Sequence, residues 1–117
     1  MTRTGLSDDE IHNIAWHSAS FELDVQNLLD SKAMDIIGWS ENPAFLLRKT
    51  PRPVDLRKRQ DAGVRFWLTR FALAAHLTID TEARVSAAAA RAWGARWSDV
   101  GATIGITAQG AQQRYRT

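Results

Sequence analysis

Glutamine and arginine side chains able to form hydrogen bonds with nucleic-acid bases and phosphates gather near the C-terminal end of the chain. Gln109, Gln112 and Gln113 have the spacing that places side chains on one face of a helix. In a major groove, glutamine can pair with adenine, and arginine with guanine or a phosphate. We expect base contacts from these glutamines, with Ala108 on the same free face. Four further residues are expected to bind phosphate, namely Thr107, Arg114, Arg116 and Arg96.

The sequence contains no constellation of residues that indicates catalysis or metal binding. The histidines His12, His17 and His76 are scattered, and the first two are five residues apart, so they do not share a helix face. The chain has no cysteine, glycine-rich phosphate loop or serine nucleophile motif. We therefore expect that the protein is not an enzyme and needs no cofactor.

Three helices joined by tight turns are expected to position the C-terminal side chains. The first spans about 81–93 and ends at Gly94. The second runs from Ser98, its expected cap, to Ile104, and the third reaches about Arg116. The expected apolar face of the first helix consists of Val85, Ala88, Ala89 and Ala92.

Two glycines and a small core set the angle between the last two helices. Gly101 lies in the middle of the second helix, where only a minimal side chain lets the third helix cross closely. Gly105 is expected to take the left-handed conformation that redirects the chain before Thr107 caps the third helix. The expected core consists of Val100, Ile104, Ile106 and Ala111.

Residues 97–115 of this unit read WSDVGATIGITAQGAQQRY and follow ARAWGA at 90–95. This stretch resembles the helix-turn-helix of small actinobacterial DNA-binding proteins and is similar to region four of bacterial sigma factors. The resemblance covers residues 82–116. It implies sequence-specific binding of double-stranded DNA by a transcriptional regulator of an actinobacterium or its phages, with the last helix in the major groove.

The sequence departs from the family pattern at the start of the last helix. Family members commonly carry a basic residue where this chain has Ala108, and Gly110 weakens the helix by about 1 kcal/mol relative to alanine. The helix therefore has no positive charge before Arg114. We expect one unit to bind weakly, so that a useful site needs two units on a homodimer.

The upstream part also reads as helical, so the fold class expected is an all-α helical bundle with a C-terminal helix-turn-helix. A capping box at Ser7 and Glu10 opens a helix expected over about 7–30. Asn42 and Pro43 are expected to open a short helix over 44–49. A longer helix over about 55–77 has apolar residues on both sides, so it is either central in the domain or shared with a second copy.

Charge is distributed unevenly along the 117 residues, although the net charge is only +2. Residues 1–47 carry −6 and residues 48–117 carry +8. With the prolines at 51 and 53, this split suggests an acidic helical region over 1–50 and a basic domain over 51–117. The halves could attract each other. Alternatively, the acidic helix could bind a basic protein, as in an adaptor or antitoxin-like inhibitor.

A basic cluster in the 55–77 helix could contact either phosphate or the acidic region. It consists of Arg57, Lys58, Arg59 and Arg65. Because the chain has no apolar run long enough for a membrane span and no signal-peptide pattern, we expect a cytoplasmic location without membrane contact.

Overall fold

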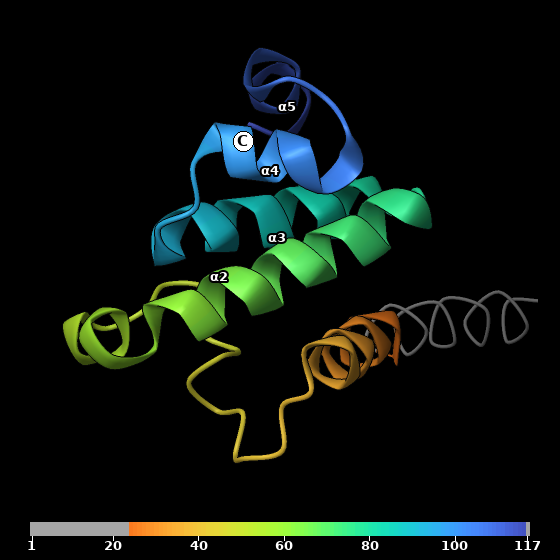
Figure 1. The fold of residues 1–117 in the computed structure, drawn as a ribbon. Coiled ribbons are helices and arrows are strands. Elements are labelled where there is room, and N and C mark those ends of the chain that lie inside the picture. The colour runs from red at the N-terminus through yellow and green to blue at the C-terminus, as the bar shows by residue number, and fades with distance from the viewer. Residues whose placement is uncertain (1–23, 117) are drawn as a thin grey trace, which may run out of the picture.

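A computed structural model describes residues 24–116, which fold into helices without any strand in that range (Figure 1). A helical segment over 24–37 is followed by four labelled helices. Their bounds are α2 Pro53–His76, α3 Asp80–Trp93, α4 Trp97–Ile104 and α5 Ala108–Tyr115. The expected all-α class is confirmed. Among these residues, no helix is long and apolar enough to cross a membrane.

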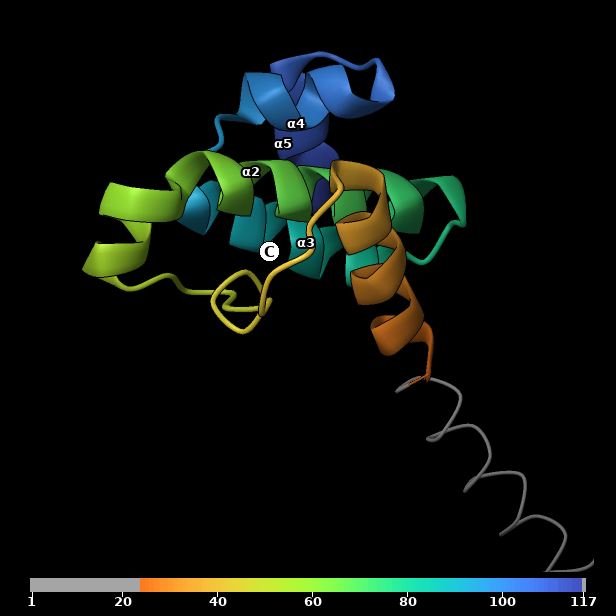
Figure 2. The same cartoon turned by 60° about the horizontal axis from the view of Figure 1, so that its bottom comes forward.

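The antiparallel helices α2 and α3 lie side by side at the centre of the described structure (Figures 1 and 2). The 24–37 segment crosses α2 on one side, and α4 and α5 stack against the α2–α3 pair on another. One buried cluster joins all five elements. Its members are Leu29, Phe71, Ala74, Ala83, Ala87, Val100, Ala111 and Tyr115.

The region before α2 differs from its sequence prediction in two places. The 24–37 helix continues past the expected end at Asp30, because the chain first turns at Gly38, where φ is 71°. The short helix expected over 44–49 is wrong. This stretch forms hydrogen-bonded turns, and the Asn42 side chain accepts the Ala44 N–H at 3.0 Å. The expected cap is therefore present, but no helix follows it. The start of the helix predicted over 7–30 lies outside the described residues.

The apolar face predicted for α3 is also wrong. Ala88 and Ala92 are exposed and Val85 is half-buried, so Ala89 is the one predicted face residue that is buried. The helix is rotated relative to the prediction. The side chains that face the core are Glu82, Ala83, Ser86, Ala87, Ala89, Ala90 and Trp93.

Helix α2 is central in the described structure, because Phe66 and Leu73 on its second apolar side pack against residues from the N-terminal part, although Leu77, just past its end, is 53% exposed. Phe66 is fully buried in a cluster with Ala33 and Leu46. The indole N–H of Trp67 donates to the Leu46 carbonyl at 2.8 Å. The indole N–H of Trp93 donates to the carbonyl of residue 48 at 2.7 Å. The segment before α2 therefore shares a core with it.

A buried guanidinium connects three of these elements. The Arg70 side chain is 3% exposed and binds Asp30 at 2.6 Å and Glu82 at 2.8 Å. It also donates to the Ser86 hydroxyl at 2.7 Å and lies 5.4 Å from the centre of the Trp67 ring. Since charges buried without partners are costly, this cluster ties the 24–37 segment and α3 to α2.

Replacing this guanidinium should strongly destabilise the fold. We expect Arg70→Met to lower the free energy of unfolding by about 3–5 kcal/mol, because the two carboxylates lose their partner. The matched surface variant Arg84→Met should change it by about 0.5 kcal/mol or less. Urea unfolding followed by circular dichroism measures both.

Adding Asp30→Asn and Glu82→Gln to Arg70→Met should restore part of the loss, because the unpaired charges are then removed. A loss below about 1 kcal/mol in Arg70→Met alone would contradict a structural role for the cluster.

An aspartate fixes the start of α2. Asp55 is 5% exposed and accepts the backbone N–H of Arg52 at 2.9 Å and its side-chain Nε–H at 3.2 Å. The hydrogen bond from the Arg52 side chain, followed by that from its backbone, holds the pKa of the Asp55 carboxyl below its usual value. The positive charges of Arg52 and Arg48 act in the same direction.

The cap at Asp55 should make stability depend on pH on the acid side. Since its folded-state pKa is lowered, its contribution is present above about pH 4 and is lost as the pH falls through the folded-state value. We expect the unfolding midpoint of Asp55→Asn to fall less steeply below about pH 4 than that of the wild type. The exposed Asp61→Asn serves as the control. Equal slopes in wild type and Asp55→Asn would contradict the prediction.

Candidate nucleic-acid interface

Helices α4 and α5 are joined by a three-residue turn with the expected backbone conformations. Gly105 is left-handed, with φ of 77°, and Thr107 caps α5 by accepting the Gly110 N–H at 3.0 Å. A Cβ atom at Gly101 would lie 2.5 Å from the Ile106 carbonyl oxygen and 2.8 Å from that of Thr107. A close approach at Gly101 is therefore present as predicted, but the turn and cap before α5 make it, and not the helix itself.

The start of α4 differs from the prediction, because Arg96 and not Ser98 is the N-cap residue. Asp99 accepts the backbone N–H of Arg96 at 2.8 Å, which repeats the arrangement of Arg52 and Asp55 at α2. Ser98 is exposed on the first turn of α4. In the sequence, this cap is indicated by Asp99, which lies three residues after Arg96.

The inner face of α5 is held firmly by the core. Ala111 and Tyr115 are buried, and the Tyr115 ring meets the Phe71 ring of α2 edge-on at 4.8 Å. Val100 of α4 is fully buried in the same cluster, with Ile104 and Ile106 packed against it. Buried contacts on successive turns of α5 leave its opposite face directed to solvent.

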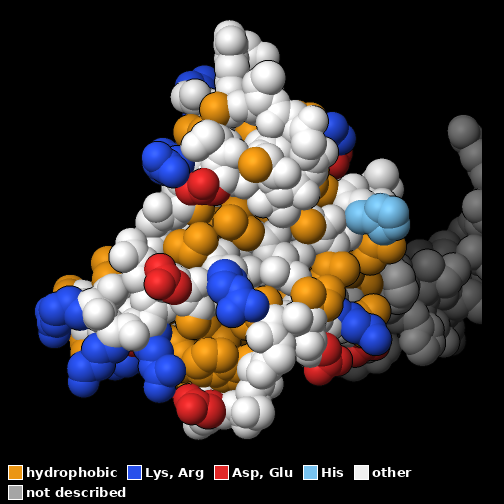
Figure 3. Space-filling view, in the orientation of Figure 1, with side chains coloured by type: hydrophobic (Ala, Val, Ile, Leu, Met, Phe, Trp, Pro, Cys, Tyr) orange, Lys and Arg blue, Asp and Glu red, His pale blue; other side chains and the backbone are white. Residues whose placement is uncertain are grey.

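That outer face carries the predicted base-contacting residues. Gln109, Gln112 and Gln113 are all exposed, and within residues 24–116 their carboxamides have no hydrogen-bond partner. Figure 3 shows that the α4–α5 end of the molecule is mostly neither charged nor hydrophobic. Ala108 is exposed beside them. The Thr107 oxygen accepts the cap hydrogen bond, so its hydroxyl hydrogen is free to donate.

The predicted phosphate-binding arginines lie at both ends of the α4–α5 unit. Arg114 and Arg116 are exposed, and the Arg114 guanidinium lies 5.2 Å from the Tyr115 ring centre. Arg96 is at the opposite end, at the start of α4. Its side chain is 80% exposed and lies 3.6 Å from the Asp99 carboxylate. The structure thus places the arginines at separate ends of the α4–α5 unit and does not gather them into one pocket.

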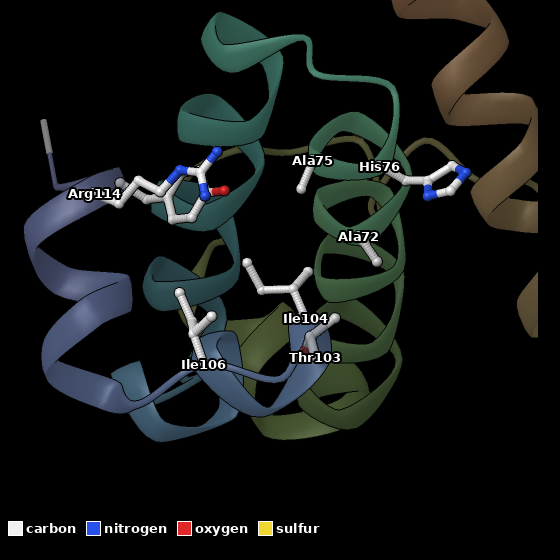
Figure 4. A pocket seen from close by; sticks show the side chains of 8 residues that line it. Ala72, Ala75, His76, Thr103, Ile104, Ile106 and Arg114 are labelled. Carbon is white, nitrogen blue, oxygen red and sulfur yellow. The ribbon is translucent and has the colours of Figure 1, made fainter.

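A shallow groove lies between α2, α4 and the end of α5 (Figure 4). Ile104 and Ile106 form one wall, with Ala72 and Ala75 of α2 opposite. The His76 imidazole points away from the groove and Arg114 lies on the far wall, so no acid, base and nucleophile converge there. Among residues 24–116, no group of three His, Asp or Glu side chains could hold a metal ion.

The basic cluster of α2 is partly engaged with the N-terminal part. The Arg59 guanidinium lies 3.4 Å from the Glu41 carboxylate and 5.6 Å from the ring centres of both Trp39 and Phe45. The other predicted members, Arg57, Lys58 and Arg65, are exposed. Arg59 therefore forms an ion pair between the acidic and the basic part of the chain. Arg70 forms a second such ion pair, with Asp30.

Comparison of the chain with protein-family models, with curated proteins and with solved structures finds no match in any of the three.

The close crossing at Gly101 predicts a specific sensitivity. We expect Gly101→Ala to lower the free energy of unfolding by about 1–3 kcal/mol, because the added methyl group meets two backbone oxygens that cannot rotate away. Gly105→Asn is the control, since asparagine tolerates the left-handed conformation and nothing lies within 4 Å of a Cβ there. Urea unfolding measures both. A stabilised Gly101→Ala would contradict the crossing.

Proposed function

We propose that the protein is a small sequence-specific binder of double-stranded DNA and acts as a transcriptional regulator in the cytoplasm. In this proposal α4 and α5 form a helix-turn-helix, and α5 enters the major groove. The observation that carries the proposal is the row of exposed carboxamides at Gln109, Gln112 and Gln113 on a helix whose opposite face is buried. Carboxamides on a rigid helix suit the donor–acceptor pair on the edge of adenine.

The charged residues of the α4–α5 unit also support the entry of α5 into the major groove. Arg114 follows the glutamines on α5, Arg116 is the extended residue just after that helix, and Arg96 lies at the start of α4, so each could contact a phosphate beside the groove. Thr107 could donate its free hydroxyl hydrogen to a phosphate at the N-terminal end of α5. In this arrangement the glutamines select the sequence and the other four residues position the helix.

Two copies of the unit are part of the proposal. Helix α5 has eight residues and no charge before Arg114, so one copy presents a short and weakly attractive surface. A homodimer places two α5 helices in successive major grooves on one side of the duplex, about 34 Å apart. Each copy then contributes half of the binding site.

A protein-binding adaptor is the second candidate function. The observation that favours it is the pair of exposed side chains Leu28 and Ile36 on the 24–37 segment, at 52% and 61% exposure. They lie beside the exposed acids Asp24 and Asp35, which would suit a basic protein partner. A stoichiometric partner that remains bound in native extract after nuclease treatment would favour this candidate.

Base selection from random duplexes tests the DNA-binding proposal. We expect Gln112→Ala to relax the preference at one base position by about 1–3 kcal/mol, since one paired contact is lost. Gln26→Ala, at an exposed position of the 24–37 segment, should leave the preference unchanged. An unaltered preference in Gln112→Ala would remove this residue from the reading face.

Arg116→Ala provides the complementary test of phosphate contact. It should weaken binding to all sequences by a similar factor and lower the slope of log K against log salt by about one. A change in base preference without a change in slope would assign Arg116 to base reading instead.

A further inference from the structure

A second charged surface lies at the beginning of α2, outside the α4–α5 unit. Basic side chains gather at this end of the molecule, at the lower left of Figure 3. We call this surface the α2 basic patch. Its members are Arg48, Lys49, Arg52, Arg57, Lys58, Arg59 and Arg65, all of which are exposed.

Nearby carboxylates balance fewer than half of these charges. Asp55 lies 3.2 Å from Arg52 and 3.8 Å from Arg48, and Glu41 pairs with Arg59. Within residues 24–116, four members have no ion pair within 4.0 Å. They are Lys49, Arg57, Lys58 and Arg65. Asp61 is the one further acid among the helix residues of the patch, so the surface has a clear positive excess.

The backbone holds these charges in a fixed arrangement. Helix α2 is kinked at Arg59, where φ is −136° and ψ is 21°. The Arg59 side chain lies over Trp39 and Phe45, and the Asp55 cap fixes the preceding turn. Arg57 and Lys58 therefore project from a short turn that is anchored on both sides.

The patch lies at the same end of the α2–α3 pair as the start of α4 (Figures 1 and 2). A Cβ atom at Gly94 would lie 2.3 Å from the Gln60 amide nitrogen, so the α3–α4 connection passes directly beside this part of α2. Arg96 follows two residues later. Arg96, the cap of α4, therefore lies at the same end of the α2–α3 pair as the patch.

We infer that the α2 basic patch binds backbone phosphates of the same duplex whose major groove α5 enters. This inference rests on the proposed function and adds a contact surface that α5 lacks. Protein interfaces are depleted in charge at their centre, whereas seven basic side chains surround the half-buried Phe45 and Val54 here. Exposed arginines and lysines at this density fit a regularly charged phosphate backbone.

Salt dependence of binding to a mixed-sequence duplex tests the inference. Each phosphate contact contributes about 0.9 to the slope of log K against log salt, so Arg57→Ala/Lys58→Ala should lower the slope by about two. Affinity should fall on the order of 50-fold at roughly 0.1 M salt, by a similar factor for every sequence. Base preference in a random-duplex selection should stay as in the wild type.

A matched pair of single variants controls for the change in net charge. Lys58→Ala should lower the slope by about one, whereas Lys32→Ala, at an exposed position of the 24–37 segment, should leave it unchanged. Equal slopes for the two single variants would overturn the inference. Unchanged urea midpoints establish that the variants are folded.

The inference and the proposed function fail in different ways. If the patch variant keeps the wild-type slope while Gln112→Ala relaxes base preference, the patch inference is overturned and the function of α5 is supported. If the patch variant lowers the slope while Gln109→Ala, Gln112→Ala and Gln113→Ala all leave base preference unchanged, the reading role of α5 is overturned and the patch is retained as a phosphate-binding surface. If the patch variant instead dissociates a dimer without DNA, in sedimentation experiments, the patch is a contact with a second copy and the inference is overturned.

Discussion

The buried Arg70 cluster is the interaction on which the arrangement of the other elements depends. A guanidinium that is 3% exposed must have its donors satisfied, and here Asp30, Glu82 and Ser86 provide the acceptors. These partners come from the 24–37 segment and from α3, so both elements must dock in one register on α2. Apolar packing alone allows neighbouring registers at moderate cost, whereas a misplaced acceptor would leave a buried charge unpaired. The cluster therefore selects one arrangement of three elements more strongly than the surrounding leucine and alanine contacts do.

The position of α5 follows from the same part of α2. Phe71, adjacent to Arg70 in the chain, meets Tyr115 at the end of α5, and Gly101 lets the turn before α5 approach α4 closely. Both ends of α5 are thus fixed, one by an aromatic contact and the other by backbone contact. A helix of eight residues is marginal by itself, so its outer face owes its direction to these tertiary contacts. On our proposal this direction is what presents the glutamines to a groove.

Sequence reasoning succeeds where one residue has a single structural solution. Gly94 and Gly105 have positive φ, and Thr107 caps α5, as their positions predict. It fails where several neighbouring residues could fill the same structural role. Four consecutive alanines at 87–90 do not show which side of α3 is buried, so the sequence pattern predicts the wrong face. Ser98 is a good cap in isolation, but Asp99 accepts the N–H of Arg96, which places the cap of α4 two residues earlier. The sequence does not predict the burial of Arg70. A charged residue in a helical pattern looks the same whether water or protein surrounds it, and here the partners lie 12 and 40 residues away.

The two halves of opposite charge have a different meaning once their contacts are known. Asp30 and Glu41 of the acidic half pair with Arg70 and Arg59, so part of the attraction acts within the molecule. The cations left over are concentrated at the beginning of α2 and around α5, while the centre of α5 is uncharged. In our proposal, base selection and attraction to phosphate are therefore carried by different residues, whereas a basic recognition helix would carry both. Neutral carboxamides would select the sequence. Cations beside them would attract the backbone phosphates, which every duplex has whatever its sequence. Selectivity would then be insensitive to salt, because hydrogen bonds to base edges release no counterions, whereas total affinity would fall steeply with salt.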